Sequence, residues 1–360
     1  MRIVFRVDGS TQIGLGHIMR CLTLATQFLP TNTVTFMSCS LPSALQQQIE
    51  GLGIQLLSTL PINDNEHNSF SSPVLDDTNQ HSHAVHCIDI LNSVGIDVID
   101  ILVIDHYQLS APYSEEMRRC SKHIVVIDDL ANREHECDVL IDQNLYEDFD
   151  TRYDNLVPNY CHTLLGPKFA ILRSEFYSPS TKLRDDKHIL ICFGGSDPLN
   201  LTERVVDVLI SLKSLTISAD IVVGEGYANI ETLEAKVNSL VNAELHVACS
   251  YISTLMNNAT TMIGGGGSMH WERAATGVAG MIITLADNQI ETTRCLHERH
   301  CCLWLGKSDE ATDIDISKAI EFAISSPQTM HKLAKNAASL VSGNKNPSFV
   351  MDTILNIITR

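Results

Sequence analysis

The sequence has 360 residues, 44% hydrophobic and 19% charged, with a formal net charge of −18 at pH 7. This length suits two domains of roughly 150 to 180 residues, and the charge argues against a nucleic acid partner, which is bound through clustered Lys and Arg. Nowhere do 18 apolar residues follow one another, so we expect neither a membrane-spanning helix nor a standard secretion signal. The eleven cysteines form no CxxC pair, which favours a cytoplasmic location.

The first half of the chain alternates between predicted strands and helices. Strands are expected at 3–7, 33–38, 54–57, 101–104, 123–127 and 139–141, and helices at 16–28, 43–52 and 84–94. The strand at 139–141 is expected to be the last of its sheet. A polar stretch from Pro61 to about Ser82 interrupts the pattern as a loop or weak insertion.

A segment at 161–187, with prolines and a charged patch, is expected to link a domain at 1–160 to a second domain at 188–360. The second domain repeats the alternation, with strands expected at 188–193, 217–223, near Leu245, and at 260–265 and 280–285. Helices are expected at 200–215, at 227–240, from Tyr251, from Ser268, and over the rest of the chain. This order predicts two Rossmann-like α/β domains whose parallel sheets face a central cleft, with ligands at the carboxyl ends of the strands.

The stretch VDGSTQIGLGHIMR at 7–20 places one histidine, His17, at the start of a helix after a glycine turn. Met19 stands where a dinucleotide fingerprint has its third glycine, so NAD binding is disfavoured. The helix dipole disfavours the imidazolium, so His17 should be neutral and able to accept a proton. The alternative is a histidine that only caps or packs. Asp8, Gly14 and Gly16 are candidate substrate-binding residues because the glycines let a ligand approach the backbone.

Two further glycine turns could bind phosphate through backbone N–H groups. In GGSDPLN at 194–200 the candidates are Gly195, Ser196 and Asp197, although an ordinary capped turn explains the motif equally well. GGGGSMHWERAATG at 264–277 is more specific, and ADNQ follows it at 286–289. There we expect Gly266, Gly267 and Ser268 to contact a diphosphate, Glu272 the ribose hydroxyls, and Asn288 and Gln289 the sugar. A tight turn without a ligand is the alternative.

Acidic residues follow two predicted strands of the first domain. Asp105, His106, Tyr107, Asp128 and Asp129 should lie at the carboxyl edge of its sheet, where the acids could fix a sugar, orient His17, or simply cap turns. Histidine clusters at 81–87 and 297–302 lack a CxxC or HExxH arrangement, so we expect no metal site there.

These motifs together resemble a known family over nearly the whole chain. RVDGSTQIGLGHIMRCLTLA, VIDHYQL, VIDDLANREHECDVLIDQN, LLGPKFAILRSEF, FGGSDPLN and GGGGSMHWERAATG with ADNQ occur in this order. They are similar to those of the UDP-2,4-diacetamido-2,4,6-trideoxy-β-L-altropyranose hydrolases of the pseudaminic acid pathway, which are related in fold to GT-B glycosyltransferases. Ala279 departs from the family, which usually has a proline there.

The resemblance implies that water attacks the anomeric carbon of a UDP-sugar with inversion and C–O cleavage, and that His17 is the general base. It implies sugar contacts for Tyr107 and Asn288, a ribose contact for Glu272, a diphosphate contact near Gly266, and a less defined role for Arg173. No metal or other cofactor is expected, the partner is a small UDP-sugar, and the sequence leaves protein partners open.

Three other functions remain open. A GT-B glycosyltransferase needs the same nucleotide site and base, although the absence of Lys and Arg between Arg20 and Arg118 disfavours a membrane-bound acceptor. A UDP-sugar-binding protein without turnover needs no base. A hydrolysing 2-epimerase needs a base at C2 with further acids, for which the sequence shows no clear set.

Overall fold

The computed structural model describes residues 1–9, 16–29, 31–39, 41–60, 74–178, 184–195, 197–212 and 215–359. The chain forms two compact units. The first comprises 1–144, 148–171 and 346–360, and the second comprises 145–147 and 172–345. The C-terminal residues 346–360 thus belong to the first unit. No helix in the described ranges is long and apolar enough to cross a membrane.

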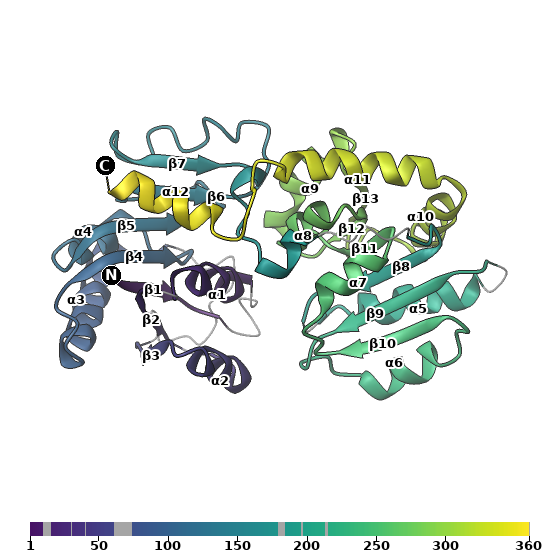
Figure 1. The fold of residues 1–360 in the computed structure, drawn as a ribbon, viewed down its shortest axis with the longest axis horizontal. Helices are drawn as coiled ribbons and strands as arrows, with labels where there is room; N and C mark the ends of the chain where they lie inside the picture. The colour runs from purple at the N-terminus through teal and green to yellow at the C-terminus, as the bar shows by residue number, and fades with distance from the viewer. Residues whose placement is uncertain are drawn as a thin grey trace. The chain divides into compact units, whose positions relative to one another are not determined.

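The first unit contains a seven-stranded parallel sheet in the order β3, β2, β1, β4, β5, β6, β7 (Figure 1). Its strands are β1 Arg2–Val7, β2 Thr33–Ser38, β3 Gln55–Ser58, β4 Ile99–Asp105, β5 Ser121–Ile127, β6 Val139–Asp142 and β7 His162–Leu165. Its helices are α1 Gly16–Phe28, α2 Ser43–Gly51, α3 Asp77–Ser93, α4 Ala111–Met117 and α12 Phe349–Ile358, with a short 3-10 turn, η1, at Pro167–Phe169. The strands are continuous apolar runs because helices cover both faces of this parallel sheet.

Four features of the first unit differ from the sequence expectations. The strand at 139–141 is not the last of the sheet, because β7 pairs with β6 in register from His162 to Leu165. Helix α3 begins at Asp77 rather than near 84, because the Asp76 carboxylate caps its N-terminus by accepting from the Asn79 N–H. The short α4 and the packing of Val350 and Ile354 from α12 in the first core were not predicted.

The second unit contains a six-stranded parallel sheet in the order β10, β9, β8, β11, β12, β13. Its strands are β8 His188–Cys192, β9 Ser218–Val223, β10 Ala243–Val247, β11 Thr261–Gly265, β12 Ala279–Thr284 and β13 Leu303–Lys307. Its helices are α5 Leu201–Ser211, α6 Ile230–Val237, α7 Ile252–Asn258, α8 Met269–Thr276, α9 Ile290–Glu298, α10 Asp313–Ser325 and α11 Pro327–Val341. Two 3-10 turns, η2 Ser174–Tyr177 and η3 Asp287–Gln289, complete it.

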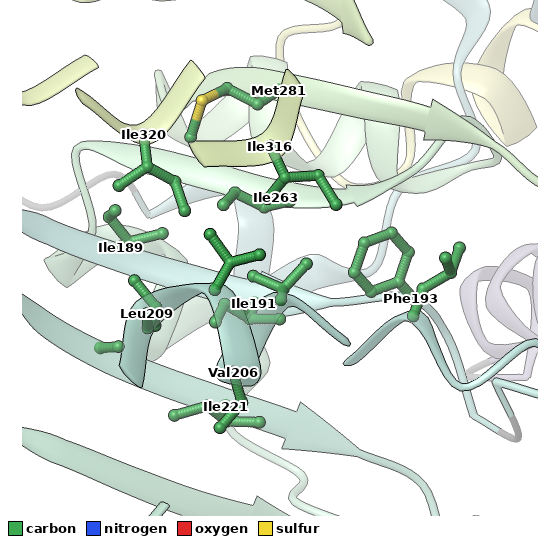
Figure 2. Packing of buried hydrophobic residues seen from close by; sticks show 14 of the residues in the cluster. Ile189, Ile191, Phe193, Val206, Leu209, Ile221, Ile263, Met281, Ile316 and Ile320 are labelled. Carbon is green, nitrogen blue, oxygen red and sulfur yellow. The ribbon is translucent and has the colours of Figure 1, made fainter. Parts of the chain in front are cut away.

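The core of the second unit lies between the sheet and its helices. Figure 2 shows part of it, with Val206 and Leu209 of α5 and Ile316 of α10 buried in the same apolar cluster as the strand residues Ile191 and Ile263. Every second residue along β8 faces this cluster, because side chains two residues apart point to the same face of a sheet. Strand β13, where the sequence indicated only helix, adds to the edge of the sheet beside β12.

Candidate active site

His17 lies in the first turn of α1, which begins at Gly16. Its Nδ1 is 2.6 Å from Oδ1 of Asp105, the last residue of β4. Strands β1 and β4 are neighbours in the sheet, so their carboxyl ends bring the two residues together. The His17 side chain is 7% exposed. Because an ionised carboxylate only accepts hydrogen bonds, Nδ1–H donates to Asp105, and Nε2 then carries the lone pair that can take a proton.

Asp105 is held in this ionised state by Arg20, one helical turn after His17. Arg20 donates from Nε to Oδ2 at 2.6 Å and from Nη2 to Oδ1 at 2.7 Å. Burial alone would raise the pKa of Asp105, but the nearby Arg20 and His17 outweigh it and hold that pKa well below its usual range. Arg20 Nη2 also lies 3.1 Å from His17 Nδ1, but both nitrogens are directed at the same carboxylate, which is the better acceptor.

Arg20 connects this pair to Asp129, which follows β5. Its Nη1 donates to Asp129 Oδ2 at 3.1 Å, and Tyr107 donates its hydroxyl to the other oxygen of Asp129 at 2.7 Å. The Tyr107 ring meets His17 edge-on, with centroids 4.5 Å apart. Burial, followed by the charge of Asp129, raises the pKa of Tyr107, so it stays a neutral donor. His17, Asp105, Arg20, Asp129 and Tyr107 therefore form one connected set, the His17 network.

Asp8 belongs to a second buried group next to this network. Both of its oxygens bind the Arg6 guanidinium, at 2.7 and 3.0 Å, and His106 Nε2 lies 3.0 Å from Oδ2. The Ser38 hydroxyl and the Cys39 backbone N–H also donate to Oδ1. The carboxylate of Asp8 thus has five protein contacts, which suits a residue that joins the ends of β1, β2 and β4.

The second unit presents glycines where the first presents charged side chains. Gly264 and Gly265 end β11, and Gly266 and Gly267 lead from it into α8. A Cβ at Gly264 would lie 2.2 Å from the carbonyl oxygen of Cys192 on β8, and one at Gly266 would lie 2.7 Å from Thr293 Oγ1. Ser268, the N-cap of α8, makes no side-chain cap hydrogen bond. The His270 and Trp271 N–H groups donate to the carbonyl oxygens of Gly267 and Ser268, so the N–H groups that precede them are the candidates for a phosphate contact.

Gln289 and Glu272 flank this turn. Gln289 Oε1 accepts from the Gly266 and Leu285 backbone N–H groups, at 3.3 and 2.9 Å, which ties η3 to the turn; Asn288 lies in the same η3. Glu272, in the first turn of α8, accepts from Arg173 at 3.1 Å. Burial raises the pKa of Glu272 even though Arg173 acts in the opposite direction.

The glycine turn after β8 differs from the turn before α8. Asp197 accepts from the Leu201 and Thr202 N–H groups at 3.1 and 2.7 Å, so its carboxylate caps α5. Gly195 approaches the backbone of Gly224, where a Cβ would lie 2.2 Å from the Gly195 carbonyl oxygen. The capped-turn alternative therefore describes Asp197 well.

The structure brings most predicted residues to the carboxyl ends of the two sheets. Gly16 lies with His17 in α1, and Gly267 with Ser268 before α8, whereas Gly14 and Ser196 lie outside the described residues. Sequence reasoning left open which acid orients His17, and the structure gives Asp105. It missed Arg20, although a spacing of three residues on a helix places Arg20 and His17 on one face.

The two parallel α/β units define a GT-B fold. MurG from Acinetobacter baumannii, a solved structure, has a TM-score of 0.66 with 14% identity, and the match covers 100% of both chains. The predicted fold class, a GT-B-like fold of two parallel α/β domains, is confirmed.

Comparison with curated proteins leads to a particular relative. The chain is 28% identical over 265 residues to the UDP-2,4-diacetamido-2,4,6-trideoxy-beta-L-altropyranose hydrolase of Campylobacter jejuni, covering 73% of this chain and 84% of that protein. It is also 21% identical to the spore coat polysaccharide biosynthesis protein SpsG of Bacillus subtilis, over 95% of each chain. No protein-family model matches the chain. The resemblance to the hydrolase, predicted from the motifs, is confirmed.

Proposed function

We propose that the protein is an enzyme that hydrolyses a UDP-linked 2,4-diacetamido-2,4,6-trideoxy sugar to UDP and the free sugar, as a step in nonulosonic acid biosynthesis. The observation that carries the proposal is the 2.6 Å contact between His17 Nδ1 and Asp105. It fixes the tautomer in which Nε2 is the basic nitrogen, as a general base for water requires. The similarity to the Campylobacter jejuni hydrolase supports this substrate class.

The two units divide the reaction between them. In the second unit, the turn at Gly266, Gly267 and Ser268 binds the diphosphate through the backbone N–H groups of Gly267 and Ser268, since that of Gly266 donates to Gln289. Glu272 binds the ribose. UDP leaves with its charge stabilised there, so the departing oxygen needs electrostatic stabilisation more than a proton.

The first unit supplies the base. His17 Nε2 takes a proton from water as the water oxygen bonds to the anomeric carbon and the bond from that carbon to the UDP oxygen breaks. The imidazolium that results faces the ionised Asp105, whose charge offsets it. Asp105 thus acts as a positioning residue through His17, and Arg20 fixes the position of Asp105.

The test incubates the protein with UDP-2,4-diacetamido-2,4,6-trideoxy-β-L-altropyranose in H2¹⁸O without any acceptor. We expect release of UDP, ¹⁸O in the free sugar rather than in UDP, and an inverted first anomer by proton NMR. Retention of configuration, or label in UDP, contradicts the mechanism. Binding of the UDP-sugar without UDP release supports a binding protein, and release only with an acceptor alcohol supports a glycosyltransferase.

The role of His17 is tested by His17→Ala and His17→Phe. UDP release should fall by roughly 10²–10⁴-fold, while UDP affinity stays within a few fold. The matched control is His331→Ala on α11, because His331 also pairs with a carboxylate, Asp186 at 2.9 Å, but is 59% exposed. Near-normal turnover in both His17 variants excludes His17 as the base.

A further inference from the structure

Four polar side chains gather on one face of β8, β9 and β10, which lie side by side in the second unit (Figure 1). Asp220 and Glu244 are direct cross-strand partners in the register of β9 and β10. His246 lies two residues after Glu244, so it points to the same face of β10. His188 opens β8 and pairs in register with Ser218, two residues before Asp220. None of these residues was singled out by the sequence motifs.

The contacts within this group converge on the Asp220 carboxylate. His188 Nε2 lies 2.9 Å from Oδ2, and His246 Nε2 lies 2.9 Å from Oδ1. Asp220, Glu244 and His246 each offer one ligand atom, a carboxylate oxygen or an imidazole nitrogen, and these three atoms lie within 4.8 Å of one another. Such spacing allows one ion to contact all three side chains.

The outer nitrogens of both histidines are also fixed. His188 Nδ1 lies 2.8 Å from the Ser218 hydroxyl, and His246 Nδ1 lies 3.2 Å from the Tyr251 hydroxyl. Each ring therefore directs its Nε2 toward Asp220. Metal-binding histidines typically have such a partner on the nitrogen that does not bind the ion, because it fixes the orientation of the ring.

Charge supplies a further reason for a cation at this position. Carboxylates directly opposite each other on neighbouring strands destabilise a sheet, and Asp220 and Glu244 stand in that relation. Two carboxylates match the charge of a divalent ion.

We propose that Asp220, Glu244 and His246, with His188 beside them, bind a divalent transition-metal ion such as Zn²⁺. Imidazole and carboxylate together suit Zn²⁺, whereas Mg²⁺ prefers oxygen ligands alone. The ion joins edge strand β10 to β9, so its role is structural. This site shares no residue with the glycine-rich segment at 264–268, and it does not depend on the proposed function.

The test titrates Zn²⁺ into the full-length protein by calorimetry and measures thermal unfolding with and without the ion. We expect one Zn²⁺ bound per chain and a higher Tm, because an ion that binds only the folded state stabilises it by mass action. Mg²⁺ at the same concentration should neither bind measurably nor raise the Tm.

The variants are Glu244→Gln and His246→Gln. The fold should tolerate Glu244→Gln because the Glu244 side chain is exposed. Each should weaken Zn²⁺ binding at least tenfold and remove the Tm increase. The control His331→Gln removes a histidine that pairs with a carboxylate elsewhere in the same unit and should bind Zn²⁺ like the parent protein. Absence of stoichiometric binding overturns the proposal. If both Glu244→Gln and His246→Gln bind Zn²⁺ as tightly as the parent protein, the proposal is also overturned, because the ion is then bound elsewhere, for example by cysteines.

Discussion

Both sheets are parallel, but different kinds of residues lie at the carboxyl ends of their strands. In the first unit, the ends of β1, β4 and β5 carry His17, Asp105 and Asp129, joined through Arg20. In the second unit, the backbones at Gly224, after β9, and at Gly264, in β11, approach neighbouring backbone oxygens too closely for a side chain. One edge presents charged side chains, and the other presents backbone N–H groups.

This contrast explains how a chain of net charge −18 could bind an anionic nucleotide. Backbone N–H groups and a helix N-terminus attract phosphate without Lys or Arg. A histidine base, by contrast, needs a neighbour that sets its tautomer. Asp105 is that neighbour for His17. In the proposed function, one sheet therefore serves binding and the other serves proton transfer.

The largest expected effect comes from Asp105→Asn. The Asn amide would donate to His17 Nδ1, which moves the ring proton to Nε2 and removes the basic lone pair. We expect kcat for UDP release to fall roughly 10²–10⁴-fold, with KM and UDP affinity little changed. Steady-state kinetics and UDP calorimetry measure the two effects separately.

The control for this variant is Asp100→Asn on the same strand, where Asp100 accepts from the Arg2 backbone and from Lys122 at 2.7 Å each. It should keep the parent kcat. An unchanged pH profile and kcat in Asp105→Asn would show that Asp105 does not set the tautomer of His17.

A change at the other edge, Gly264→Ala, should act on stability. The added Cβ would lie 2.2 Å from the Cys192 carbonyl oxygen, and this backbone atom can move only if β11 separates from β8. We expect a loss of about 3 kcal/mol or more in the free energy of unfolding, at the upper end of overpacking effects. Denaturant unfolding measures it, and Gly51→Ala, with nothing within 4 Å of its Cβ, is the control. Equal stability of the two variants would mean that the close approach is absent in solution.

The acids at the first edge should also make stability depend on pH. Burial, followed by the charge of Asp129, raises the pKa of Asp142 to about 7, although Arg152 opposes the shift. The folded state therefore holds a proton that the unfolded state releases near pH 4. The stability from this group is full below pH 4 and is lost as the pH rises through about 7.

Replacing this acid tests the sign of the dependence. Asp142→Asn removes the titration, so its Tm relative to the parent should be higher at pH 8 than at pH 5, by a few °C. A constant Tm difference between pH 5 and pH 8 would show that Asp142 titrates normally in the folded protein.

The sequence predicted the fold better than it predicted the contacts of the site. Strand and helix periodicity identified most elements, because buried parallel strands are continuous apolar runs. Polar composition concealed the start of α3, and β7 lies in a segment with the proline and charge content of a linker. Residue type alone could not decide which of several acids meets His17. That choice depends on β4 lying next to β1, a pairing between residues about 100 positions apart.

Asp197 illustrates the same limit at the second edge. Its motif suited a phosphate turn or a capped helix, and only the hydrogen bonds to Leu201 and Thr202 distinguish them.

The smallest predicted effect follows from this. Asp197→Ala should lower the free energy of unfolding by about 1 kcal/mol, the usual loss when a cap is removed, whereas Asp197→Asn should restore most of it because the amide oxygen also accepts. Denaturant unfolding of both variants tests this. A cap role fails if the two variants are equally destabilised, and the α5 turn is then the better candidate for a second anion contact, because its own carboxylate does not satisfy the N–H groups of the helix.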